Sequence, residues 1–342
     1  MSSPIVSIVI PTYNRATYVT RAIESVLAQT YPNLELLVVD DGSMDDTETM
    51  IYRYAAQDAR IRFFRQANAG VSAARNRAVA ESKGCYVAFL DDDDRWLPDK
   101  LVIQVAFMEA HPRVVLSYTR SQLRHADGQG SGQFGESPWP PLNDSPETFE
   151  DLLRPFVNIT PSRVMVRAAV VRELGGFNTS YRVNEDYELW LRVAQRGRLA
   201  ALDGALTVTE KDGRSTLSQC AITNARSGVE VLRHLALSPN HQRCEGLRRR
   251  HLAYLLYLLA REYYEQGQEG LAAKAFAEAV WYDPLIGLRV RRRGETGVAL
   301  AGRVVKAYAA IVVCAIKAVS NSQFVVSRKL AAARKPRLEN RD

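Results

Sequence analysis

The chain has 342 residues, of which 46% are hydrophobic and 24% charged, a composition that fits one large or two smaller globular domains and excludes disorder along the whole length. Its four cysteines are scattered without a Cys-x-x-Cys pair, and we expect no secretory leader, so we predict a reducing, cytoplasmic setting. The net charge of +7 is unevenly placed: residues 286–342 carry 13 Lys and Arg against 3 Asp and Glu, which gives +10 there and leaves −3 for residues 1–285.

The first 120 residues alternate β-branched runs with helical patterns, which predicts an α/β fold with a mostly parallel sheet flanked by helices. Strands are predicted at residues 5–10, 34–39, 61–64, 86–90 and 114–118, and helices at 16–29, 45–56, 71–81 and 98–111. Ligands of such sheets bind beyond the carboxyl ends of the strands. A dinucleotide-binding domain is disfavoured, because the turn after the first strand has no glycine.

The pattern of residues 121–220 predicts a less regular alternation of strands and helices. Residues 121–146 are rich in Gly, Ser, Pro and Asn and read as a long loop. A short helix at 147–153, a strand at 163–166, a turn at 175–177 and an amphipathic helix at 186–195 follow. We therefore expect one domain at 1–220, in two parts at 1–120 and 121–220.

Beyond this domain the pattern is helical. Residues 221–285 are predicted as a helical region, and 251–284 fit one tetratricopeptide-like hairpin. Residues 286–342 form a basic amphipathic tail whose longest uncharged stretch is too short to span a bilayer. The tail either lies on a membrane surface or covers the hairpin. We expect peripheral membrane contact from the first alternative, and no nucleic-acid partner.

Four aspartates, Asp91 to Asp94, follow the apolar run at 86–90. Two like charges 4 Å apart repel by roughly 4 kcal/mol at an effective dielectric near 20, so a cation is the simplest explanation for the cluster. Oxygen ligands alone suit Mg²⁺ or Mn²⁺. The alternative is a solvated acidic turn that caps the next helix. Asp91 and Asp93 are two residues apart, which would place them on one side of an extended chain.

Two further segments carry candidate ligand-binding residues. Gly70 stands at a predicted helix start, where free N–H groups favour an anion, and Arg75 would then reach that anion. The alternative is a capped helix whose Arg75 pairs with the acidic rim. Asp41 lies in an Asp-Asp-Gly-Ser segment that suits either a ligand contact or a tight turn.

Read together, residues 6–14, 38–47, 68–76 and 89–94 resemble the motifs of the family 2 glycosyltransferases of the GT-A fold. The resemblance covers residues 4–215, and it implies that 1–120 is the nucleotide-binding part of the domain and 121–220 its acceptor part. It implies a nucleotide-diphosphate sugar donor, with Tyr13 stacked on the base, Asp41 accepting a hydrogen bond from the base, and Asp93 as the direct metal ligand. We expect donor contacts from Pro11, Thr12, Tyr13, Asp41, Gly70, Arg75, Asp91 and Asp92.

The resemblance also implies an inverting reaction in which Asp186 is the general base and Glu185 orients it. By itself, Asn-Glu-Asp at a helix start is also ordinary capping. Many relatives carry a His before a Ser after this helix, whereas this chain has Thr-Glu-Lys-Asp-Gly-Arg-Ser at 209–215. Lys211 or Arg214 is a candidate for closing over the diphosphate.

We therefore predict an inverting, metal-dependent glycosyltransferase that uses a UDP-sugar or similar donor and a glycan or lipid-linked acceptor in surface polysaccharide synthesis. Its place would be the cytoplasm or the inner face of the plasma membrane. A nucleotidyltransferase of the same fold is disfavoured, because the chain lacks the Gly-rich, Arg/Lys-bearing loop at its start. The alternative from another class is a catalytically silent binding or scaffold protein.

Overall fold

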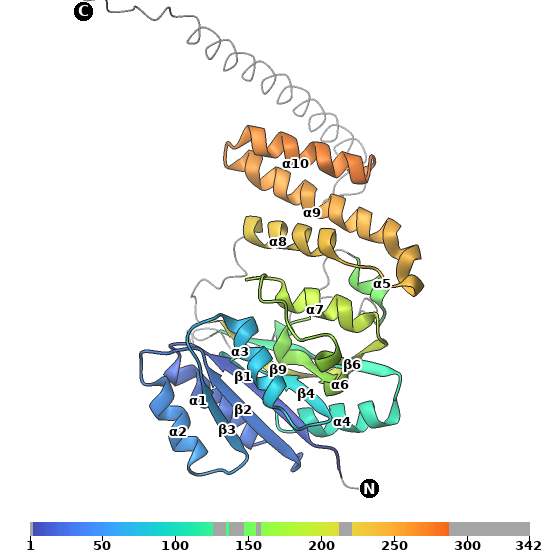
Figure 1. The fold of residues 1–342 in the computed structure, drawn as a ribbon. Coiled ribbons are helices and arrows are strands. Elements are labelled where there is room, and N and C mark those ends of the chain that lie inside the picture. Colours follow the sequence, from blue (N-terminus) through green and yellow to red (C-terminus); the bar gives the residue numbers. More distant parts are fainter. Residues whose placement is uncertain (1–2, 126–134, 137–146, 155–158, 212–220, 287–342) are drawn as a thin grey trace, which may run out of the picture. The chain divides into compact units, whose positions relative to one another are not determined.

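The computed structural model describes residues 3–125, 135–136, 147–154, 159–211 and 221–286 (Figure 1). The chain divides into two compact units. Unit 1 is Met1–Gln219 with Leu235–Glu245, and unit 2 is Cys220–His234 with Gly246–Asp342. The division falls near residue 220, where the domain boundary was predicted, but the short segment Leu235–Glu245 belongs to unit 1.

Unit 1 begins with alternating strands and helices, as the sequence predicts. The strands are β1 (Val6–Thr12), β2 (Leu34–Asp40), β3 (Ile61–Arg65) and β4 (Tyr86–Phe89), and they run parallel in the order β3-β2-β1-β4. The helices are α1 (Ala16–Leu27), α2 (Thr47–Ala55), α3 (Val71–Glu81) and α4 (Lys100–Ala110). Each lies within a few residues of its predicted bounds.

The second half of the sheet is mixed. The order continues from β4 through β8 (Val164–Arg167), β6 (Val114–His125) and β9 (Arg198–Lys211) to β5 (Asp94–Trp96), and β7 (Gly135–Glu136) pairs with β6. β8 is antiparallel to both neighbours, whereas β9 is parallel to β6. The α/β class is confirmed, but the sheet of the described residues is more evenly mixed than expected.

This half of the sheet corrects one sequence prediction and contains a strand that was not predicted. The segment 121–146 does not begin as a loop, because β6 continues to His125, where its backbone pairs with β9. β9 itself was not predicted. The polar composition that suggested a loop is compatible with a strand that pairs on both edges near its end. Residues 126–134 and 137–146 lie outside the described part of the chain.

Side chains alternate between the two faces of the sheet along β1, and hydrophobic residues pack on both faces. Ile8 and Ile10 belong to a cluster that includes buried residues of α1, α2 and α4. The opposite face carries α3, and there Phe89 packs edge-on against Phe177 at 5.2 Å between ring centres and lies 6.1 Å from Trp190. Trp190 comes from α7 (Glu185–Ala194), which follows α5 (Phe149–Leu152) and α6 (Ala168–Glu173).

Unit 2 contains α8 (Ala221–His234), α9 (Glu245–Glu265, from Gly246 on) and α10 (Glu269–Tyr282). The last two form the predicted hairpin, with the rings of Tyr257 and Phe276 packed 5.6 Å apart. Gly267 makes the turn between them at a φ of +71°, which favours glycine. Among the helices described here, none combines the length and apolarity that crossing a membrane requires. The basic tail from residue 287 on lies outside the described residues.

Candidate active site

The candidate residues gather at the edge of the sheet where β1, β2 and β4 end. β1 and β2 pair to their last residues, so Thr12 lies opposite Asp40, and the Asp41 N–H donates to the Thr12 carbonyl oxygen at 2.9 Å. Because the three strands are parallel, the segments that follow them share one rim. The predicted location of the site at this rim follows from the strand order.

The four aspartates form a turn, not an extended strand. The Asp94 N–H donates to the Asp91 carbonyl oxygen at 3.0 Å, and β5 starts at Asp94. The expectation that Asp91 and Asp93 face one side of an extended chain is therefore wrong. Each instead pairs with a different arginine at 2.7 Å, Asp91 with Arg75 and Asp93 with Arg15. Because of this turn, β5 begins at Asp94, the last of the four aspartates, and pairs there with β9.

Asp92 is buried and joins the cluster to β1. The Thr12 hydroxyl donates to its Oδ2 at 2.7 Å, and Arg15 Nη1 lies 3.3 Å from its Oδ1 and 2.7 Å from Asp93 Oδ2. Loss of water raises the pKa of Asp92 to about 7, against the opposing effects of Arg15 and Thr12. Arg15 therefore compensates part of the negative charge at this turn. The sequence analysis did not single it out.

Ser162 supports the aspartate turn from another segment, the short 3-10 helix at Pro161–Arg163. Its hydroxyl accepts from the Asp91 N–H at 3.0 Å and hydrogen-bonds to the Asp94 carboxyl, while its carbonyl oxygen accepts from Trp96 Nε1 at 2.7 Å. Burial raises the pKa of Asp94 well above its usual range. Ser162 carried no sequence signal, because its partner Asp91 is 71 residues away.

Asp41 anchors the loop that leads into α3. Its Oδ1 accepts from Gln66 Nε2 at 2.8 Å and from the Ala69 N–H at 2.9 Å, and its Oδ2 accepts from the Gly70 N–H at 2.8 Å. Gly70 has a φ of +90°, and nothing lies within 4 Å of a Cβ built there. The space at the start of α3 is therefore open. Asp41 is buried and holds the loop that borders that space.

Arg75 is buried and connects the aspartate turn to α7. Its Nη2 donates to Asp91 Oδ1 at 2.7 Å and its Nη1 to Glu185 Oε1 at 2.8 Å. The guanidinium carbon lies 5.1 Å from the centre of the Phe177 ring. Burial acts to lower the pKa of Arg75, but the two carboxylates outweigh it and raise that pKa. The structure thus shows the pairing with the acidic rim, and contact with a diphosphate stays a prediction.

Asp186 lies in the first turn of α7, directly after Glu185. It is half-buried, and its Oδ1 accepts from the Tyr187 N–H at 2.7 Å. Loss of water, followed by the charge of Glu185, raises the pKa of Asp186 to about 7, and Arg75 acts in the opposite direction. A carboxylate with a pKa near neutrality suits a general base. Glu185 and Asp186 are thus brought to the aspartate turn through Arg75.

The turn before α7 is held by α3. Asn76 Nδ2 donates to the Phe177 carbonyl oxygen at 2.8 Å, and its Oδ1 accepts from the Phe177 N–H at 2.7 Å. A Cβ at Gly176 would lie 2.3 Å from that Oδ1. The Gly-Gly-Phe turn was predicted, but its contact with Asn76, 101 residues away, was not. This contact fixes the ring that lies against Arg75.

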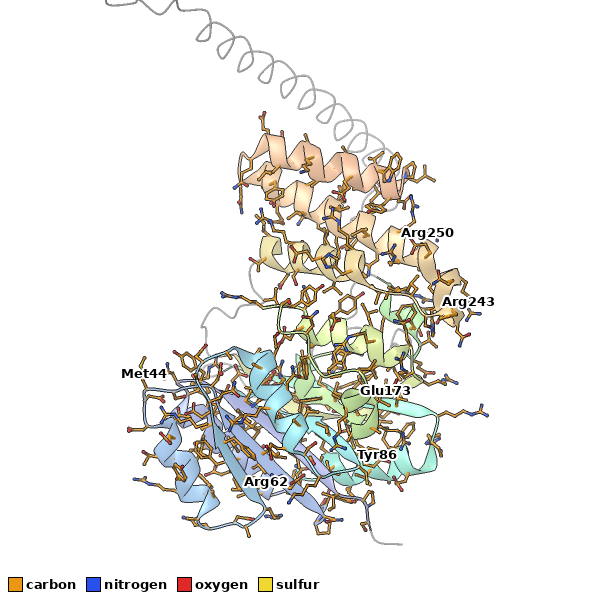
Figure 2. The ribbon with its side chains drawn as sticks, viewed as in Figure 1. Met44, Arg62, Tyr86, Glu173, Arg243 and Arg250 are labelled. Atoms are coloured by element: carbon orange, nitrogen blue, oxygen red, sulfur yellow. The ribbon has the colours of Figure 1, made fainter. Side chains whose placement is uncertain are left out.

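Tyr13 and Met44 are exposed at the rim, by 42% and 87% respectively. Their loops are tied together, because the Met44 N–H donates to Asn14 Oδ1 at 2.7 Å. Figure 2 labels Met44. Pro11 and Thr12 are buried at the end of β1. The side chain of Lys211 and the whole of Arg214, the candidates for a closing segment, lie outside the described residues.

The sequence motifs imply a divalent metal. The residues at the rim fit a metal that takes only one or two protein ligands. In the described part of the chain no group of three or more His, Cys, Asp or Glu side chains is placed to hold a metal ion. Mg²⁺ and Mn²⁺ bind sites of one or two carboxylates completed by phosphate oxygens and water. Asp91 and Asp93 offer partly exposed carboxylates of that kind, with side chains 29% and 34% exposed.

Comparisons with known proteins identify a family and a shared fold. Residues 7–175 match the family model described as glycosyl transferase family 2. The chain is 33% identical over 195 residues to the "Putative teichuronic acid biosynthesis glycosyltransferase TuaG" of Bacillus subtilis, a match that covers 57% of this chain and 73% of that protein. It is 34% identical over 213 residues to an "Uncharacterized glycosyltransferase" of Rickettsia felis, covering 61% of this chain but only 33% of that longer protein.

Two solved structures share the fold. The first 349 residues of S. aureus TarS in complex with UDP-GlcNAc superpose with a TM-score of 0.64 at 19% identity, covering 90% of this chain and 88% of that chain. The mannosyltransferase PcManGT of Pyrobaculum calidifontis, in complex with GDP-Man and Mn²⁺, gives a TM-score of 0.57 at 19% identity, covering 92% and 87%. At this identity the likeness establishes the fold alone.

Proposed function

Because this chain belongs to glycosyl transferase family 2, we propose that it transfers a sugar from a nucleotide-diphosphate donor to a hydroxyl group of a glycan or lipid-linked acceptor. The observation that carries the proposal is the bridge from Asp91 through Arg75 to Glu185. It joins the rim where a donor would bind to the helix that carries Asp186.

In this proposal the acceptor hydroxyl loses its proton to Asp186 as its oxygen attacks the anomeric carbon. One displacement breaks the bond to the diphosphate and inverts the anomeric centre. Glu185, held by Arg75, sets the charge next to Asp186 and so tunes the pKa of the base. A base with a pKa of about 7 is half ionised at neutral pH and can accept a proton there.

The donor would lie across the rim. Tyr13 is exposed enough to stack on the nucleobase, and the open space at Gly70 admits the donor's phosphates near the first N–H groups of α3. Asp41 is buried, and both of its oxygens hold the loop that borders this space, so a hydrogen bond from the base would be an additional one. Asp93 would hold a divalent metal, with Asp91 and Asp92 nearby for ribose or metal-bound water. When bound, such a metal neutralises charge that builds on the departing diphosphate.

The nucleotide of the donor and the glycan that is made are further proposals. We propose a UDP-sugar, but solved structures of this fold carry UDP-GlcNAc in one case and GDP-Man in another, so the fold does not select the base. A role in surface polysaccharide synthesis is supported by the name of the B. subtilis relative. We further propose that the protein works in the cytoplasm, at the inner membrane face, where its basic tail contacts anionic lipid.

Calorimetric titration of UDP and GDP tests the donor site. We expect binding with Mn²⁺ that weakens at least tenfold in EDTA and in Asp93→Asn, whereas Asp58→Asn, whose carboxylate pairs locally with Arg60, leaves it unchanged. Absence of binding by the wild-type protein for both nucleotides would refute the proposal and favour the scaffold alternative. The thermal unfolding of each variant serves as the folding control.

A further inference from the structure

One end of the α9–α10 hairpin carries exposed aromatic and basic side chains. The guanidinium carbon of Arg249 lies 5.6 Å from the ring centre of Tyr282, so the first turns of α9 meet the last turn of α10 there. Trp281 is 76% exposed and Leu285 51% exposed. Arg250, labelled on α9 in Figure 2, is exposed as well. We call these five residues the hairpin end.

Acidic side chains also lie near this end of the hairpin. Asp283 is buried, and Glu278 pairs with Arg233 of α8. Arg249 and Arg250 are exposed at the same end of the hairpin as the exposed Trp281 and Leu285. Isolated exposed apolar residues are ordinary, but a Trp and a Leu grouped with arginines are typical of a binding surface.

We propose that the hairpin end docks on an anionic lipid surface. Trp281 would enter the interface between headgroups and acyl chains, which tryptophan prefers because one edge of its ring is polar. Arg249 and Arg250 would meet anionic headgroups while their apolar stems cover the surface beside Trp281. The inference goes beyond the proposed sugar transfer and uses none of its site residues.

Charge decides between lipid and the chain's own tail as the occupant of this surface. The tail starts next to Leu285 and carries +10, so the basic hairpin end repels it. Both basic elements instead suit one anionic partner. A lipid surface uses the exposed Trp281 and Leu285, which a phosphate-only partner would leave in water.

The test uses the full chain and vesicles with brominated acyl chains, which quench a tryptophan that reaches the bilayer. Trp96 and Trp190 are buried, so in a Trp139→Phe background the quenchable signal is that of Trp281, and Trp281→Phe gives the blank. We expect quenching with vesicles containing phosphatidylglycerol and none with phosphatidylcholine alone. Arg249→Gln/Arg250→Gln should weaken vesicle binding by on the order of tenfold. Tyr264→Ala, exposed by 59% and close to the turn of the same hairpin, is the matched control.

Three results would overturn the proposal. Co-sedimentation with anionic vesicles without quenching of Trp281 would assign binding to the tail alone. Protection of Trp281 from acrylamide in the absence of lipid would show that the tail covers it. Binding of single-stranded RNA that depends on Arg249 and Arg250, with no binding to vesicles, would assign the surface to nucleic acid.

Discussion

Arg75 and Glu185 are 110 residues apart in the chain and meet through a hydrogen bond of 2.8 Å between Nη1 and Oε1. With the second bond from Arg75 to Asp91, this contact couples the aspartate turn to the start of α7. A buried cation held by two carboxylates is costly to remove, because the carboxylates then remain unpaired.

Arg75→Gln is therefore expected to destabilise unit 1 by about 3 kcal/mol or more. It should also raise the pKa of Asp186, since the charge of Arg75 lowers that pKa in the wild type. Chemical denaturation and the pH–rate profile measure the two effects. Arg53→Gln, at an exposed position of α2, is the control and should cost less than about 0.5 kcal/mol. Equal effects of the two variants would contradict a special role for Arg75.

Substitution of Asp186 by Asn should have opposite effects on activity and on stability. The folded state raises its pKa to about 7, above the unfolded value, so ionisation of Asp186 opposes folding and stability contributed by this group is lost as pH rises toward 7. Asp186→Asn should thus be more stable than the wild type at pH 8 by about 1 kcal/mol after allowance for solvent screening, and no more stable at pH 4. Thermal melts at both values of pH check this, and a lower melting temperature of the variant at pH 8 would argue against the raised pKa.

Gly175 and Gly176 form a matched pair for the contact between α3 and the turn. Both have positive φ, +74° and +76°, but only a Cβ at Gly176 would strike Asn76. Each Ala variant should lose about 1 kcal/mol to backbone strain. Gly176→Ala should lose a further 1 to 3 kcal/mol, about the cost of breaking the two hydrogen bonds to Phe177. Equal unfolding free energies for the two variants would show that Asn76 moves aside without cost.

Arg15 neutralises the carboxylate that we assign to the metal. Arg15→Gln should therefore tighten Mn²⁺ binding in the absence of nucleotide by several-fold, as measured by calorimetry, because the ion no longer competes with the guanidinium at Asp93. Arg21→Gln is the control, since the guanidinium carbons of Arg15 and Arg21 both lie over the Tyr18 ring, 5.7 and 5.9 Å from its centre. Unchanged or weaker Mn²⁺ binding in Arg15→Gln would contradict the assignment of Asp93.

The sequence predicted the elements whose periodicity is local. The first four strands and helices follow from alternating and helical patterns, and the rim position of Tyr13, Asp41 and the aspartates follows from where those strands end. β9 was not predicted, because its place in a mixed sheet depends on pairing with strands that are distant in the sequence, and local patterns do not show such pairing. The same reason explains why the tight turn at Asp91–Asp94 was expected to be extended.

Side-chain contacts between residues that are distant in the sequence were not predicted either. The motifs marked Arg75 and Glu185 separately, but one interpretation of Arg75 was a direct phosphate ligand, and only tertiary packing shows its pairing with both carboxylates. Ser162 and Asn76 act through side-chain to backbone hydrogen bonds over long sequence separations. Such bonds leave no periodic trace in the sequence.

The most direct test of the central claim is the release of nucleoside diphosphate from a panel of nucleotide sugars, in the presence and absence of candidate acceptor glycans, by the wild type and Asp186→Asn. The account predicts acceptor-stimulated release by the wild type and a loss of about 10² to 10⁴-fold in the variant, with nucleotide binding retained. Release by Asp186→Asn at the rate of the wild type would contradict the assignment of Asp186 as the base that activates the acceptor.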